Sequence, residues 1–213
     1  MDDKLHHYIE SLVEERSPFF AEMEQFAREN GVPIMEVVGI EALLQFLRIQ
    51  KPKRILEIGT AIGYSALRMA DALPDAVVVT VERDEERYHQ ANEYIKKASC
   101  QNRIHVIQGD ALETVSEVQA YGPFDSIFID AAKGQYTKFF ESYTPFLSKQ
   151  GVVYSDNVLF KGYVAENEIE SKRLRNLVKK IKGYNEWLMK HPDYVSAIIP
   201  VGDGLAISTK RGE

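Results

Sequence analysis

Two acidic positions, each at the end of an apolar run, are the residues of this chain best suited to chemistry. Asp130 ends the run FDSIFID, and Lys133 follows three positions later. The pair Asp156-Asn157 ends a second run, GVVYSDN. Carboxylate and amide oxygens suit Mg²⁺ or Ca²⁺, and neither His nor Cys is near them in the sequence to favour zinc. A single aspartate there is more often a helix cap, but the combination predicts that Asp130, Asp156 and Asn157 bind a divalent cation.

A glycine-rich turn follows an earlier apolar run in ILEIGTAIGYS (55–65). Such a turn lets the backbone approach a ligand closely and aims a helix N-terminus at it. The spacing Glu57-x-Gly59-x-x-x-Gly63 differs from the dinucleotide pattern Gly-x-Gly-x-x-Gly, because Ala61 stands where a pyrophosphate needs the closest approach. Taken alone, the glycines could serve only a tight turn between a strand and a helix.

Two further acids end the next two apolar runs. Glu82 ends VVVTVE, where a carboxylate can accept two hydrogen bonds from a ribose diol, although it could also be a solvated loop residue. Asp110 follows RIHVIQG, where it could contact an adenine amino group or simply cap the next helix. Together with the glycine turn they predict one crevice for an adenosine-containing cofactor, at the carboxyl edge of a sheet.

An alternation of short strands and longer helices would bring these positions together. From about residue 53 the chain follows that rhythm, which predicts crossover connections and a parallel sheet. The last two runs, 193–200 and 204–210, are separated by only three residues, so they must be antiparallel and reverse one strand at the edge of the sheet. The other candidate strands are 54–59, 77–82, 103–109, 125–130 and 151–156.

The first 50 residues are predicted to be helical, with breaks at Ser17-Pro18 and at residues 30–33. We expect two or three helices there that lean on the sheet or on a partner subunit. The fold class is therefore α/β, with a mostly parallel sheet of seven strands that ends in an antiparallel hairpin.

The length and composition of the chain limit the number of domains, the cellular compartment and the possibility of a membrane span. A chain of 213 residues with 45% apolar residues suits one domain over 1–213, with residues 1–50 as a helical cap or dimerisation region. The single cysteine, Cys100, excludes an internal disulfide and favours a reducing compartment, so we expect a cytoplasmic protein. No stretch approaches 18 consecutive apolar residues, so we expect no membrane span.

A net charge of −6 disfavours proteins that coat nucleic acid non-specifically, but it leaves room for a local basic patch. The segment 171–182, SKRLRNLVKKIK, carries six basic residues and no acidic one. Its apolar residues recur at helical spacing, which predicts an amphipathic helix with a strongly basic face. Lys161 could extend that patch. Such a face is more often a solvated surface than a track for phosphates.

Five motifs in order resemble those of the cation-dependent O-methyltransferases, the family of catechol and caffeoyl-CoA O-methyltransferases. They are EIGTAIGYS, VERDEER, QGDALE, FIDAAKGQY and SDNVLFKG, and the likeness runs from about residue 35 to the C-terminus. The resemblance implies a Rossmann-like class I methyltransferase fold, S-adenosylmethionine (SAM) as methyl donor, Mg²⁺ or another divalent cation, and a homodimer.

The resemblance also implies roles for individual residues. Asp130, Asp156 and Asn157 match the metal ligands of the family. Asp130 is also expected to take part in the cofactor site and in catalysis. Lys133 matches the proposed general base of the family. Around SAM, the family places Glu57, Gly59 and Ser65 at the methionine end, Glu82 on the ribose, Asp110 and Ala111 at the adenine, and Met35, Val37 and Gly39 near cofactor or substrate. The stretch MEVVGIEAL that holds the last three departs from the commoner family pattern.

Among bacterial members, the chain looks most like the tRNA 5-hydroxyuridine methyltransferases, which make 5-methoxyuridine at the wobble position. This implies the tRNA anticodon loop as substrate. A small catechol-like or hydroxylated aromatic metabolite is the alternative, because both acceptors place a hydroxyl beside a second oxygen that one cation can chelate. The basic segment 171–182 favours RNA.

Two other classes of function compete with a methyltransferase. A nicotinamide dehydrogenase shares the fold neighbourhood, but Ala61 in the glycine turn and the closing hairpin argue against it. A non-enzymatic RNA-binding or assembly module would not need the set of Asp130, Lys133, Asp156 and Asn157.

Overall fold

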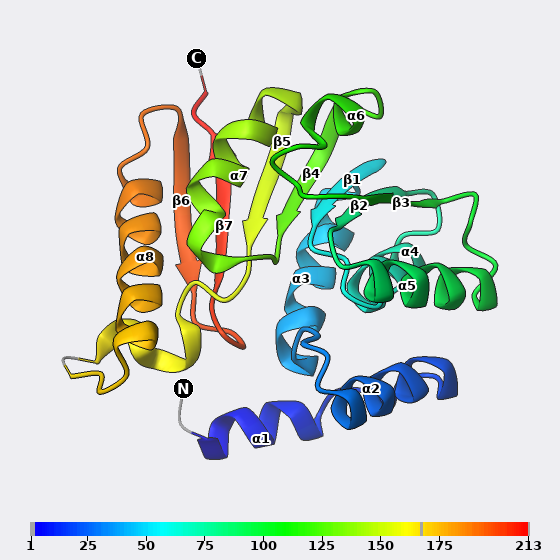
Figure 1. Ribbon diagram of the computed structural model, residues 1–213, viewed down its shortest axis with the longest axis horizontal. Helices are drawn as coiled ribbons and strands as arrows, with labels where there is room; N and C mark the ends of the chain where they lie inside the picture. Colours follow the sequence, from blue (N-terminus) through cyan, green and yellow to red (C-terminus); the bar gives the residue numbers. More distant parts are fainter. Residues whose placement is uncertain (1–2, 167, 213) are drawn as a thin grey trace.

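The structure, a computed structural model, describes residues 3–166 and 168–212, so residues 1–2, 167 and 213 of the predicted domain lie outside it. Among the described residues, seven strands pair into one sheet in the order β3-β2-β1-β4-β5-β7-β6 (Figure 1). The strands are β1 (Arg54–Ile58), β2 (Val77–Glu82), β3 (Ile104–Gln108), β4 (Phe124–Ile129), β5 (Leu147–Ser155), β6 (Tyr194–Ile199) and β7 (Leu205–Lys210).

The strands β1 to β5 run parallel, as the alternating pattern predicts. The antiparallel hairpin is also confirmed, since β7 pairs antiparallel with both β5 and β6. The expected place of the reversed strand is wrong, because β6 forms the edge and β7 lies between β5 and β6. A long helix carries the chain past β5 to start β6 parallel to it, and the short turn then folds β7 back into the gap, where both of its edges are hydrogen-bonded.

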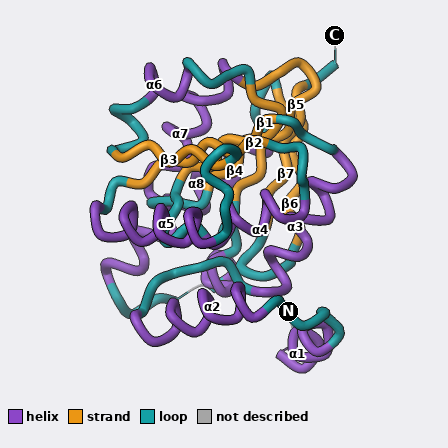
Figure 2. The backbone as a smooth tube through the Cα atoms, turned by 90° about the vertical axis from the view of Figure 1, so that its right-hand side faces the viewer, coloured by secondary structure: helices purple, strands orange, loops and turns teal. Residues whose placement is uncertain are grey.

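Alternate residues of the central strands pack on opposite faces of the sheet, and helices cover both (Figures 1 and 2). Ile55 and Phe128 pack against α2 to α5, whereas Leu56 and Ile127 pack against α6 to α8. Burial on both faces explains why these strands read as near-continuous apolar runs. The helices are α1 (Asp3–Ser11), α2 (Pro18–Asn30), α3 (Val37–Gln50), α4 (Tyr64–Ala72), α5 (Glu85–Lys97), α6 (Val115–Gln119), α7 (Tyr136–Tyr143) and α8 (Lys172–Met189), with 3-10 helices η1 (Lys133–Gln135), η2 (Thr144–Phe146) and η3 (Phe160–Ala165).

A buried charge network ties the N-terminal helices to α4. Arg68 of α4 donates to Tyr64 Oη at 2.8 Å and to Glu41 of α3. Glu24 of α2 accepts from Tyr64 Oη at 2.7 Å and from Arg16 Nε at 2.9 Å. Removing one partner of such a buried network typically costs ~3–5 kcal/mol, because it leaves an uncompensated charge. The expected packing of N-terminal helices on the rest of the chain is thus realised by α2 and α3.

Within residues 3–166 and 168–212, no helix combines the length and the apolar character that crossing a bilayer requires.

Candidate active site

A cavity of about 670 Å³ opens at the carboxyl ends of the parallel strands, the edge at which the sequence predicts a cofactor crevice. Its size suits a cofactor together with part of an acceptor. Val37 and Glu57 are the two predicted site residues that do not line it. The predicted residues that do line it are Met35, Gly39, Gly59, Ser65, Glu82, Asp110, Ala111, Asp130, Lys133, Asp156 and Asn157.

Gly59 lies where the tips of β1 and β4 pass each other at the cavity floor. Its φ of +104° is unfavourable for other residues, and a Cβ there would lie 2.0 Å from the Asp130 backbone oxygen. The Asp130 N–H donates to the Ile58 oxygen at 2.9 Å, and the Gly59 N–H donates to the Val81 oxygen at 3.1 Å. Glycine is therefore required for the three strand tips to converge, which supports the interpretation of this turn as more than a strand-to-helix connection.

Glu82 is held in place by the backbone on both sides of it. Its Oε2 accepts from the Ala61 N–H at 2.8 Å, and its Oε1 accepts from the Asp84 N–H at 2.9 Å. A carboxylate offers about four lone-pair sites, so each oxygen can still accept from a ligand hydroxyl. The buried, oriented carboxylate is therefore suited to a ribose diol and is not a solvated loop residue.

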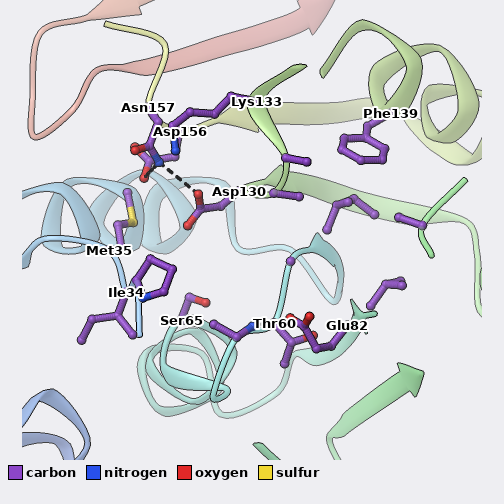
Figure 3. Close-up of a pocket in the computed structure, with 18 of the residues that line it drawn as sticks. Ile34, Met35, Thr60, Ser65, Glu82, Asp130, Lys133, Phe139, Asp156 and Asn157 are labelled. Atoms are coloured by element: carbon purple, nitrogen blue, oxygen red, sulfur yellow. Dashed lines mark hydrogen bonds between the residues drawn. The ribbon is translucent and has the colours of Figure 1, made fainter. Parts of the chain in front are cut away.

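Glu57 lies beneath the cavity, fully buried behind Ser65. The Ser65 hydroxyl hydrogen-bonds to one of its oxygens, and Thr80 Oγ1 donates to the other at 2.6 Å. Burial raises the pKa of Glu57 to about 8, and the hydrogen bonds from Ser65 and Thr80 offset part of that effect. Glu57 thus acts on the cavity through Ser65, whose side chain reaches it (Figure 3).

Asp110 does not cap the following helix. Its Oδ1 accepts from the Leu112 N–H at 2.9 Å in a local turn, while α6 begins only at Val115, after Thr114. Asp110 and Ala111 both line the end of the cavity next to Glu82, where the adenine is expected.

The acidic residues predicted for a cation gather at the opposite end of the cavity (Figure 3). Asn157 Nδ2 donates to Asp130 Oδ1 at 3.0 Å and to Asp156 Oδ2 at 2.8 Å. Burial raises the pKa of Asp130, against the opposing effect of Lys133, and burial with the charge of Asp130 raises the pKa of Asp156 well above its usual value. Two buried carboxylates that disfavour each other's ionisation are the environment that a cation would relieve.

The donor set fits a hard divalent cation. Among residues 3–166 and 168–212, no three His, Cys, Asp or Glu side chains lie close enough to share a metal ion, so a third ligand must come from elsewhere. A half-turn of the Asn157 amide would exchange its nitrogen for its oxygen and face that oxygen to both carboxylates. Asp130, Asp156 and Asn157 would then present three oxygens, the ligand type that Mg²⁺ and Ca²⁺ prefer.

Lys133 extends from η1 toward Asp156 and Asn157 (Figure 3). Its Nζ lies 5.6 Å from the ring centroid of Phe160, which also lines the cavity. The side chain therefore reaches the place where an acceptor bound at the acidic end would lie.

Phe160 and Asp203 are among the residues that line this end and that sequence reasoning missed. Asp203 sits in the turn between β6 and β7, which the sequence marks only as a short connection. Phe160 lies three positions after Asn157 and could have been found as the first aromatic residue that follows the SDN motif.

Comparison with known proteins adds independent evidence. A family model described as O-methyltransferase matches residues 10–211. The caffeoyl-CoA O-methyltransferase of Stellaria longipes is 31% identical over 95% of this chain and 88% of its own.

Solved structures agree. A Staphylococcus aureus protein provisionally described as a caffeoyl-CoA O-methyltransferase is 40% identical, with a TM-score of 0.87 over 98% of this chain and 96% of its own. The O-methyltransferase TomG of Streptomyces achromogenes, solved in complex with SAM, is 26% identical with a TM-score of 0.82 over 98% of this chain and 96% of its own.

Proposed function

Because this chain belongs to the O-methyltransferase family and is a SAM-dependent O-methyltransferase, we propose that it requires a divalent cation and methylates 5-hydroxyuridine in the anticodon loop of tRNA. The proposal concerns the cation and the acceptor. The observation that carries the acceptor is a row of exposed cations on α8 beside Lys133.

The two ends of the cavity suit the two reactants. Ser65 and Glu82 lie at one end, where SAM would be held, and Asp130 and Asp156 lie at the other (Figure 3). Transfer is an in-line displacement, in which the acceptor oxygen bonds to the methyl carbon as the carbon–sulfur bond breaks. The residues at the two ends must therefore hold oxygen and sulfur on opposite sides of that carbon.

The acidic end would activate the acceptor. A divalent cation held by Asp130, Asp156 and Asn157 would lower the pKa of an acceptor hydroxyl and fix its direction. Lys133 Nζ is the group placed to receive the released proton (Figure 3). In 5-hydroxyuridine the C5 hydroxyl adjoins the C4 carbonyl, so the base offers two neighbouring oxygens, as a catechol does.

The basic face of α8 adjoins this end of the cavity. A Cβ on Gly134, next to Lys133, would lie 3.2 Å from Lys180 Nζ, so Lys180 covers the turn that carries Lys133. Arg173 lies seven residues before Lys180, on the same side of the helix. Both are exposed, and neither makes an ion pair with a described residue. Unpaired cations beside an active site can bind the phosphates of RNA. A small uncharged acceptor has no phosphates and would gain no affinity from them.

The test is nucleoside analysis of tRNA from a strain that lacks the gene, incubated with the protein, SAM and Mg²⁺. We expect 5-hydroxyuridine to be converted to 5-methoxyuridine, and EDTA to stop the conversion. If the protein leaves 5-hydroxyuridine unchanged but methylates a catechol, the acceptor proposed here is wrong.

Paired variants test the role of α8. We expect the double variant Arg173→Ala/Lys180→Ala to raise KM for tRNA by about tenfold. The slope of log binding constant against log salt concentration should become shallower by about 0.7 for each lost phosphate contact. Lys96→Ala removes an exposed cation from α5 and serves as the control. If Lys96→Ala weakens tRNA binding as much as the α8 variant does, the overall charge of the protein, and not a phosphate-binding surface on α8, would explain the result.

A small hydroxylated aromatic compound is the second candidate acceptor. The names of relatives such as the Stellaria longipes enzyme favour it, because caffeoyl-CoA carries a catechol ring. Comparing kcat/KM for a catechol and for hypomodified tRNA decides between the two, and a higher value for the catechol would favour this candidate.

A further inference from the structure

The turn between β6 and β7 reaches into the acidic end of the cavity. The Asp203 backbone oxygen accepts from the Leu159 N–H at 2.9 Å and from the Phe160 N–H at 3.1 Å. The Gly204 oxygen accepts from the Val158 N–H at 3.1 Å. Three consecutive N–H groups that follow Asn157 are thus held by this turn, which sets the position of the loop carrying the predicted cation ligand.

The side chain of Asp203 takes no part in these backbone hydrogen bonds. It is half-buried and lines the cavity. Within the described part of the chain its carboxylate makes no hydrogen bond and no ion pair. Its charge acts on both Asp130 and Asp156 and opposes their ionisation. An unpaired carboxylate that shares a cavity with two others costs stability, so a compensating partner is expected.

The charges at this end of the cavity show what that partner must be. Counted by formal charge, Asp130, Asp156 and Asp203 contribute three negative charges and Lys133 contributes one positive charge. Glu36 and Lys161 also line the cavity, and their opposite formal charges add nothing to this sum. The excess is two negative charges, which one divalent cation neutralises. Asp130 and Asp156 alone, beside Lys133, would leave one positive charge of such a cation uncompensated.

We propose that Asp203 is a third anionic group of the cation site, a positioning residue that holds the cation through its charge and through a ligand water rather than by direct coordination. Among the described residues, no three His, Cys, Asp or Glu side chains lie close enough to share a metal, so we assign Asp203 to the surroundings of the cation and not to its direct ligands. The inference rests on the cation dependence proposed above. Groups that orient the ligands of a metal are typically worth 10–100-fold in metal affinity.

The test is a calorimetric titration of the full-length protein with Mg²⁺, repeated with Mn²⁺ followed by its paramagnetic resonance signal, without SAM or acceptor. Asp203→Asn keeps the backbone hydrogen bonds and the size of the side chain while it removes the charge. We expect it to weaken Mg²⁺ binding about tenfold or more, to leave SAM affinity unchanged and not to lower the unfolding temperature of the metal-free protein. Asp203→Glu should restore affinity to within about threefold of wild type.

Asp193→Asn is the matched control. Asp193 is exposed and precedes β6, so it belongs to the same hairpin but lies at the opposite end of the strand from the turn. Its substitution removes the same charge, and we expect Mg²⁺ affinity within about twofold of wild type.

Three results would overturn the inference, each in a recognisable way. If Asp203→Asn binds Mg²⁺ within about twofold of wild type, Asp203 has no role in the site, although the cation dependence stands. If Asp203→Glu is as weak as Asp203→Asn, the shape of the turn matters and its charge does not. If wild type binds SAM but no Mg²⁺ or Mn²⁺, the proposed cation dependence itself fails.

Discussion

The buried acids near the cavity fall into two groups with different partners, and the two groups have different tasks. Asp130 and Asp156 face each other across the Asn157 amide, in an environment that a cation would relieve. Glu57 instead meets two hydroxyls and no cation. Glu57 is therefore expected to be protonated near neutral pH, and its effect on the cofactor is structural, through the orientation of Ser65.

Glu57 should make stability depend on pH. Its pKa is about 8 in the folded state, against 4.5 as the ordinary value, so between about pH 4.5 and pH 8 the folded chain binds a proton that the unfolded chain releases. Stability therefore falls as pH rises through that window. We expect wild type to lose ~4 kcal/mol more than Glu57→Gln between pH 5 and pH 8.5, measured by urea unfolding. Parallel pH profiles of the two proteins would contradict the buried, protonated state.

Lys133 should be needed for the chemical step and not for binding. We expect Lys133→Ala to lower kcat by about 100-fold or more, because proton transfer in the transition state contributes that much, while SAM affinity and unfolding temperature stay unchanged. Lys138→Ala, an exposed change on α7, is the control. Single-turnover kinetics with saturating SAM would measure the effect, and near-normal turnover of Lys133→Ala would exclude Lys133 as the base.

Among the elements, the turn between β6 and β7 links parts that are distant in the sequence. It supports residues 158–160 through backbone hydrogen bonds, and a Cβ on its Gly202 would lie 3.2 Å from the Gly39 Cα atom of α3. The N-terminal helices and the cation loop are thus held against one another by this turn. Its glycines leave room for both contacts.

Gly204→Ala should damage the cation site through the backbone. Gly204 has φ of +91°, and a Cβ there would lie 2.4 Å from the Leu159 Cγ atom. We expect a loss of ~2–4 kcal/mol in stability together with weaker Mg²⁺ binding, because the loop after Asn157 must shift. Gly31→Ala is the control, since Gly31 also has positive φ but no atom within 4 Å of a Cβ. It should lose only ~1 kcal/mol and keep Mg²⁺ affinity.

For the whole molecule, the first helix is the part least integrated into the core. α1 exposes Leu5 and Tyr8, and Leu12 lies just after its end; 49%, 60% and 64% of their surfaces are accessible. The spacing of Leu5 and Tyr8 places both on one side of the helix. The helix lies away from the sheet, below α3 (Figure 1). This face is where the homodimer expected from the family resemblance would find apolar surface, and the homodimer remains a prediction.

Tyr8→Glu tests that interface. If two copies meet through α1, a buried glutamate would be left without a partner, and we expect light scattering to show a dimer for wild type and a monomer for the variant. Tyr121→Glu, at an exposed tyrosine before β4, should remain dimeric. A monomeric wild type would contradict the homodimer, and a dimeric Tyr8→Glu would place the interface elsewhere.

The sequence by itself determined the strands, their acidic tips and the edge at which those tips meet. Strand periodicity and turn residues are local signals, and the carboxyl ends of parallel strands must share one edge, so Asp130 and Asp156 could be predicted to lie near Glu82 and Gly59. These local signals could not predict the order of the strands in the sheet. The insertion of β7 between β5 and β6 depends on which edge completes its hydrogen bonds.

Only the tertiary structure decided which side chains share a site. Glu57 faces Ser65 and Thr80 because β1, β2 and α4 meet in one register, and that contact takes the carboxyl out of the cavity. Asp203 joins Asp130 because the final hairpin returns beside β5, more than 70 residues later in the chain. Contacts of this kind follow from strand order and packing, which no local pattern records, and they decide the charge of the proposed cation site.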